Sequence, residues 1–180
     1  MRKRRTLLLL AGAALVAAIG AFQVWVLRGR VATVEPGRLY RSAALTPDRL
    51  LEVSRRYGVT TVIDFRKTQA DVDAEAERLA RAGIEHVSLA TGQVPSAEAV
   101  AEFLRLMDAK RGEPVLIHCR HGVGRTGVFS AIYRMEYQGW PRWRAITEAM
   151  LVAGFDSFGP GNPKTAFLKT YTPRRTRPPR

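Results

Sequence analysis

Short apolar runs alternate with helix-like segments along the middle of this 180-residue chain. The strand candidates, which are β-branched or continuously apolar, are residues 37–42, 59–65, 84–89 and 115–117. Helical patterns are expected at 48–57, 71–82, 96–109, 126–137 and 141–152, several of them bounded by an initial proline or a final glycine. Strands separated by helices of this length predict an α/β fold with a mostly parallel central sheet flanked by helices.

An apolar segment precedes this region. Residues 7–27 read LLLLAGAALVAAIGAFQVWVL, with no charge and one amide at Gln23. A helix of that length spans about 30 Å, so we predict a single-pass transmembrane anchor at 7–27 after a basic N-terminus at 1–6. A cleaved signal peptide is the alternative, with a mediocre cleavage site at Ala18-Ile19-Gly20. The excess of positive charge before the span predicts that the N-terminus lies inside and that the remainder is extracytoplasmic.

The rest of the chain is predicted to form one domain over 31–171, followed by a disordered Pro- and Arg-rich tail at 172–180. The net charge is +13, but the basic residues cluster at the two ends and the stretch between them is close to balanced. The charge is therefore weak evidence for nucleic-acid binding, and no specific nucleic-acid partner is predicted. The single cysteine excludes an internal disulfide framework and a multi-cysteine metal site.

One loop carries most of the chemical information. Residues 115–128 read VLIHCRHGVGRTGV, which predicts a strand running into Cys119 and a helix opening near Arg125. A loop that closes on a helix N-terminus points several backbone N–H groups into one concavity and so binds anions. Gly122 and Gly124 permit the backbone turns that this requires. The N–H groups, the helix dipole and Arg125 would together stabilise a Cys119 thiolate.

This loop resembles the His-Cys-x5-Arg-Ser/Thr signature of the cysteine-based protein tyrosine phosphatase superfamily. Within it, the chain is most similar to compact dual-specificity-type phosphatases and their bacterial relatives. Three further segments carry the resemblance: Arg38-Leu39-Tyr40-Arg41-Ser42, Val62-Ile63-Asp64-Phe65-Arg66 and Tyr133-Arg134.

The resemblance implies that Cys119 attacks phosphorus and that water hydrolyses the resulting phosphocysteine, with no metal or cofactor required. It further implies that Arg125 binds the phosphoryl group, that His118 tunes the thiolate and that Thr126 assists its departure. The loop residues that would surround the phosphate are Arg120, His121, Gly122, Val123, Gly124 and Arg125.

A general acid is missing from its usual place. Resembling enzymes protonate the leaving oxygen with an aspartate on a loop that precedes the cysteine, but here residues 89–95 read LATGQVP and contain no carboxylate. Asp71 and Asp73 could approach from another loop, whereas Glu85 and Glu98 are expected in a strand and at a helix start. The general acid is left unassigned.

Three functions remain open. The main prediction is a phosphotyrosine or dual-specificity phosphatase acting on a phosphorylated protein or small molecule. The second is a phosphatase for phosphoinositides, inositol polyphosphates or polyphosphate chains; in a polyphosphate chain the leaving group is an acidic phosphate that needs less protonation. The basic loop residues Arg120 and His121 suit such substrates. The third is a catalytically weak, phosphate-binding pseudophosphatase at the membrane.

Overall fold

A five-stranded sheet forms the centre of the molecule, with strand order β1-β2-β5-β3-β4. The computed structural model describes all residues except 1, 68, 154 and 175–180. The strands are β1 (Ala32–Glu35), β2 (Leu39–Ala43), β3 (Thr61–Asp64), β4 (Glu85–Ser88) and β5 (Val115–Cys119). Only the β1–β2 pair is antiparallel; β2–β5, β5–β3 and β3–β4 are parallel. The predicted mostly parallel sheet is confirmed.

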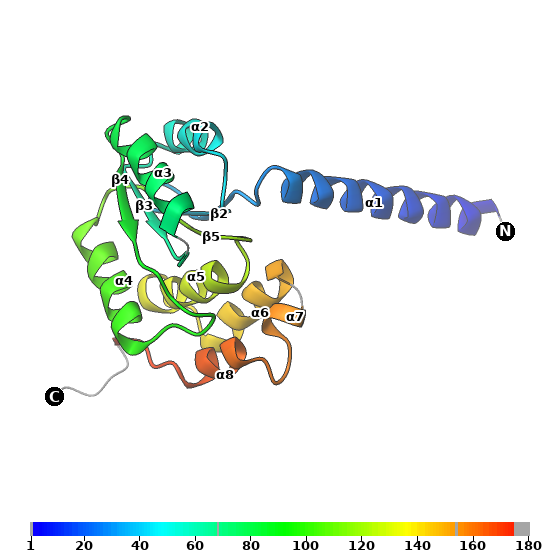
Figure 1. Ribbon diagram of the computed structural model, residues 1–180. Coiled ribbons are helices and arrows are strands. Elements are labelled where there is room, and N and C mark those ends of the chain that lie inside the picture. Colours follow the sequence, from blue (N-terminus) through cyan, green and yellow to red (C-terminus); the bar gives the residue numbers. More distant parts are fainter. Residues whose placement is uncertain (1, 68, 154, 175–180) are drawn as a thin grey trace.

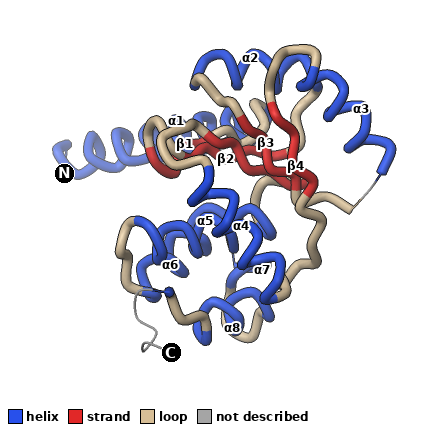
Figure 2. Tube along the Cα trace, turned by 90° about the vertical axis from the view of Figure 1, so that its left-hand side faces the viewer, coloured by secondary structure: helices blue, strands red, loops and turns tan. Residues whose placement is uncertain are grey.

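Helices cover both faces of this sheet (Figures 1 and 2). One face carries α2 (Pro47–Tyr57) and α3 (Gln69–Ala80), and the other carries α4 (Ala97–Ala109), α5 (Gly124–Tyr137), α6 (Arg142–Ala153), α7 (Phe155–Phe158) and α8 (Pro163–Thr170). Neighbouring strand residues alternate between two apolar cores: Val62 and Leu116 belong to the first, Ile63 and Ile117 to the second. Because both faces are buried, the central strands read as continuous apolar runs.

The predicted boundaries of α2 and α4, for which the sequence supplies caps, are confirmed to within one residue, whereas the helix predicted at 71–82 runs instead from Gln69 to Ala80. Pro47 occupies the first turn of α2, and Gly58 ends it in the left-handed conformation with φ +66°. Ser96 starts α4, where its Oγ accepts a hydrogen bond from the Ala99 N–H at 3.2 Å. Strand β1 escaped prediction because it is a short edge strand with an irregular register opposite β2.

The N-terminal segment forms α1 (Arg2–Leu27), which extends away from the sheet (Figure 1). Among the described residues, no helix combines the length and the apolar character needed to cross a membrane. The anchor expected at 7–27 is therefore not found, and the predicted orientation of the domain stays a prediction.

Most of the predicted tail, residues 175–180, lies outside the described residues. Its last described residue, Arg174, forms ion pairs with Asp108 at 2.6 Å and with Glu136 at 3.0 Å. The chain just before the tail is thus held against α4 and α5.

Candidate active site

The signature loop lies at the carboxyl end of the central strand. Cys119 is the last residue of β5 and only 3% exposed, and α5 begins at Gly124. The neighbouring strands end beside it, because Ala43 of β2 pairs with Cys119 and Asp64 of β3 pairs with His118. Carboxyl ends of parallel strands meet at one edge, where open α/β sheets place their ligand sites. The predicted strand–loop–helix arrangement is confirmed.

Gly122 is required by the geometry of this loop. Its φ is +67°, and a Cβ added there would lie 2.5 Å from the backbone nitrogen of Ala43 and 2.7 Å from the carbonyl of Ser42. Neither backbone group can move without disturbing β2, so a side chain at 122 is excluded by both conformation and space. At Gly124 the nearest atom would be the Gln93 side-chain oxygen at 2.9 Å, a flexible group that can give way.

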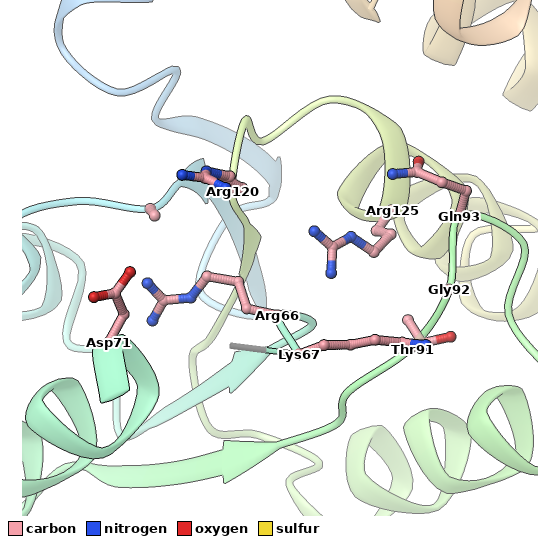
Figure 3. Close-up of a pocket in the computed structure, with 9 residues that line it drawn as sticks. Arg66, Lys67, Asp71, Thr91, Gly92, Gln93, Arg120 and Arg125 are labelled. Carbon is pink, nitrogen blue, oxygen red and sulfur yellow. The ribbon is translucent and has the colours of Figure 1, made fainter. Parts of the chain in front are cut away.

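Arg125 projects from the first turn of α5 into a cavity of about 390 Å³ (Figure 3). Its Nη1 donates a hydrogen bond to the carbonyl oxygen of Phe65, which ties the guanidinium to the end of β3. The remaining lining residues are Ala44, Arg66, Lys67, Asp71, Thr91, Gly92, Gln93 and Arg120. Arg66 is already paired with Asp64 and Glu75, which leaves Lys67, Arg120 and Arg125 against the one lining carboxylate, so the cavity is suited to a phosphorylated ligand.

The other predicted loop residues fall into two groups. Arg120 is exposed and lines the cavity, whereas His121 is exposed, lies outside the lining set and accepts a hydrogen bond at its carbonyl from Arg30 Nη1 at 3.2 Å. Val123 is half-buried immediately before α5. Thr126 is buried, and its hydroxyl oxygen has no hydrogen-bond partner among the described residues. That leaves the hydroxyl available for the leaving-thiolate role that the resemblance implies.

A buried ionic cluster, missed at the sequence level, supports the loop from behind. We define the back cluster as Asp64, Arg66, Glu75, His86 and His118. His118 is 1% exposed, and its Nε2 lies 2.8 Å from Glu75 Oε1. Arg66 bridges the two acids: its Nε donates to Asp64 Oδ2 at 2.8 Å and its Nη2 to Glu75 Oε2 at 2.7 Å.

The charges of the back cluster depend on one another. Burial raises the pKa of Glu75, but its interactions with His118 and His86 and the charge of Arg66 outweigh burial and bring that pKa down to about 2. Burial lowers the pKa of His86, yet its attraction to Asp64 and Glu75 prevails and raises it to about 9. The pKa of Asp64 is likewise held well below its usual range, since the partners His86 and Arg66 overcome the effect of burial.

The structure separates the four acids considered for proton donation. Only Asp71, near the start of α3, lines the cavity, where it faces inward beside Arg66 (Figure 3). Asp73 is exposed outside the lining set, Glu85 is paired with Lys110 at 2.6 Å, and Glu98 lies exposed in the first turn of α4. The segment that usually carries the acid contributes Thr91, Gly92 and Gln93. At the position where related phosphatases carry an acidic residue, this chain therefore presents the side-chain amide of Gln93.

Comparison with known proteins agrees with this geometry. A family model described as "DSP-PTPase phosphatase fused to NAD+ Kinase" matches residues 29–156. The dual specificity protein phosphatase TpbA of Pseudomonas aeruginosa strain UCBPP-PA14 is 39% identical over 112 residues, which are 61% of this chain and 49% of that protein. Human CDC14A, also a dual specificity protein phosphatase, is 30% identical over 128 residues, 68% of this chain and 20% of that protein. The chain thus spans about half the length of TpbA and less of CDC14A.

Solved structures show the same fold. The crystal structure of P. aeruginosa TpbA superposes with a TM-score of 0.63 at 30% identity, covering 80% of this chain and 86% of that chain. The catalytic core of SIW14 from S. cerevisiae, a PP-IP phosphatase, has a TM-score of 0.67 at 19% identity over 79% of this chain and 85% of that one. The second likeness concerns the fold alone. Since the family match spans most of the chain and includes the whole signature loop, this chain belongs to the dual-specificity-type cysteine phosphatases of that family.

Proposed function

We propose that this chain hydrolyses phosphate monoesters of the phosphotyrosine or dual-specificity type through a phosphocysteine on Cys119. The observation that carries the proposal is the loop itself: a buried cysteine at the end of β5 and Arg125 in a cationic cavity. A Cys-to-Ser variant of TpbA has been solved in complex with pTyr, at 28% identity to this chain, which supports the same substrate class here.

Each residue of the loop then has a chemical role. The Cys119 sulfur attacks phosphorus while the bond to the leaving oxygen breaks, and water afterwards attacks the phosphocysteine to release phosphate and regenerate the thiolate. Arg125 and the loop N–H groups hold the equatorial oxygens as negative charge builds on them. His118, fixed through Glu75, holds the end of β5 in place beneath the loop. Thr126 donates its hydroxyl to the departing sulfur.

A second substrate class is favoured by two features of the cavity. The segment 89–95 presents Gln93 instead of an acid, and Lys67 and Arg120 add positive charge beyond Arg125. A phosphoanhydride offers a phosphate leaving group that departs without a proton, and the further phosphates of a polyphosphate or inositol polyphosphate would pair with those cations. We therefore propose polyphosphorylated compounds, including phosphoinositides, as the alternative substrates.

The test measures phosphate release from four substrates: a phosphotyrosine peptide, a phosphoserine peptide, tripolyphosphate and a phosphoinositide in vesicles. Cys119→Ser should abolish release from whichever is hydrolysed, while inorganic phosphate still binds in calorimetry. Arg120→Ala should lower kcat/KM for tripolyphosphate more than for the phosphotyrosine peptide if polyphosphates are the substrates. A wild-type protein that binds phosphate but releases none would favour the pseudophosphatase alternative and refute both proposals.

A further inference from the structure

Four side chains of the back cluster converge on one point. Asp64 comes from β3, Glu75 from α3, His86 from β4 and His118 from β5, and one ligand atom from each lies within 4.8 Å of all the others. Their side chains are between 0% and 5% exposed. Two imidazole nitrogens and two carboxylate oxygens are thus gathered in a site closed to bulk water.

The carboxylate oxygens are divided between two partners. Arg66 binds Oδ2 of Asp64 and Oε2 of Glu75. The other oxygen of Glu75, Oε1, faces the imidazoles, at 2.8 Å from His118 Nε2 and 3.3 Å from His86 Nε2. Oδ1 of Asp64 lies 3.8 Å from His118 Nε2 and also accepts a hydrogen bond from the backbone N–H of Arg66 at 2.8 Å. Oδ2 of Asp64 lies 3.8 Å from His86 Nε2. A cation among these inward-facing atoms would leave the ion pairs of Arg66 in place.

His86 provides an independent indication. Its side chain is only 5% exposed, yet its Nε2 has no hydrogen-bond partner among the described residues. Glu75 Oε1 is near it, but the approach does not have the alignment of a hydrogen bond. A buried polar atom without a partner is costly, and this one is aimed into the cluster.

The charges leave room for a cation. Two ionised carboxylates against one Arg66 leave a net charge of about −1 when both imidazoles are neutral. A proton on His86 can neutralise it, and a metal ion can take the place of that proton. Two imidazoles and two carboxylates suit tetrahedral Zn²⁺, and Arg66 would act as the outer partner that orients the carboxylates.

We propose that Asp64, Glu75, His86 and His118 bind one Zn²⁺ ion behind the catalytic loop. Arg66 lines both the active-site cavity and the cluster, so a displacement of its side chain would open a path for the ion from the cavity. The site does not depend on the proposed phosphatase function. Because His118 directly precedes Cys119 on β5, metal binding would affect the position of Cys119.

The decisive experiment uses the full chain carrying Cys119→Ser, which removes the thiol as a competing zinc ligand. Zn²⁺ is titrated at pH 7 against a chromophoric chelator. We expect one ion per chain, and we expect His86→Gln in the same background to weaken binding by about 100-fold or more, since even outer partners of a metal contribute 10- to 100-fold. His121→Ala is the matched control: it removes the exposed histidine and should leave the affinity unchanged.

A second measurement needs no substitution in the cluster. The chain has three histidines, so their imidazole ¹⁵N resonances can be followed in the Cys119→Ser protein as Zn²⁺ is added. The resonances of His86 and His118 should shift in a 1:1 titration while those of His121 stay in place. Absence of stoichiometric binding, a shift confined to His121, or full affinity in a folded His86→Gln protein would each overturn the proposal.

Discussion

Replacing Glu75 by glutamine removes one charge from the back cluster while keeping the shape of the side chain. Glu75 is 4% exposed and accepts hydrogen bonds from Arg66 and His118. Its pKa falls from 4.5 to about 2 on folding, and at 1.36 kcal/mol per unit this corresponds to about 3 kcal/mol of stability at neutral pH. That agrees with the roughly 3–5 kcal/mol lost when a buried ion pair loses one partner.

The same shift predicts how the loss depends on pH. Because the folded pKa lies below the unfolded one, the stabilisation is fully present above about 4.5 and disappears as the pH falls toward 2. The difference between wild type and Glu75→Gln should therefore be about 3 kcal/mol at pH 7 and about half of that at pH 3.

Urea unfolding of the metal-free protein in EDTA, followed by circular dichroism at pH 7, 5 and 3, measures both quantities. Glu77→Gln is the control, since Glu77 lies on the same helix but pairs with Arg81 at the surface, with both side chains about 70% exposed. That variant should change the free energy of unfolding by less than about 0.5 kcal/mol. A loss below about 1 kcal/mol for Glu75→Gln at pH 7, or a loss independent of pH, would refute the assignment of an ionised, buried Glu75.

Three further predictions concern the cluster and the loop. The pKa of His86 is about 9 in the folded protein against 6.5 in the unfolded chain, so the stability that it contributes is present below pH 6.5 and is lost as the pH rises through 9. In urea unfolding of the metal-free protein, His86→Gln should therefore flatten the fall of the unfolding free energy at alkaline pH. An unchanged fall would contradict the shift. Gly122→Ala should lower kcat/KM by about 100-fold or more, because the new Cβ cannot fit against Ala43 while residue 122 keeps its left-handed conformation. Gly124→Ala should have a milder effect on kcat/KM. Equal activities of the two variants would show that position 122 tolerates a side chain. The dependence of log kcat/KM on leaving-group pKa across substituted aryl phosphates should be steeply negative and unaffected by Asp71→Asn; a flat dependence that steepens in that variant would identify Asp71 as the general acid.

Local features of the chain were readable from the sequence. The alternation of strands and helices predicted the parallel sheet, because periodicity and caps act over a few neighbouring residues. The reactive loop was equally accessible, since Cys119 and Arg125 lie within one short segment that a strand and a helix hold at its two ends. The empty general-acid position was also visible as the absence of a carboxylate at 89–95.

Contacts between distant segments were decided only by the tertiary structure. His118 is 43 residues from Glu75, and nothing in the spacing of Asp64, Glu75 and His86 indicates that β3, α3 and β4 bring them to one buried point. Likewise, only the packing of α3 against the sheet distinguishes Asp71, which reaches the cavity, from a neighbour two residues away. A sequence pattern indicates which face of its own helix or strand a residue occupies. Strand order and helix placement determine which of these faces meet, and the buried charges of this protein are brought together by that arrangement.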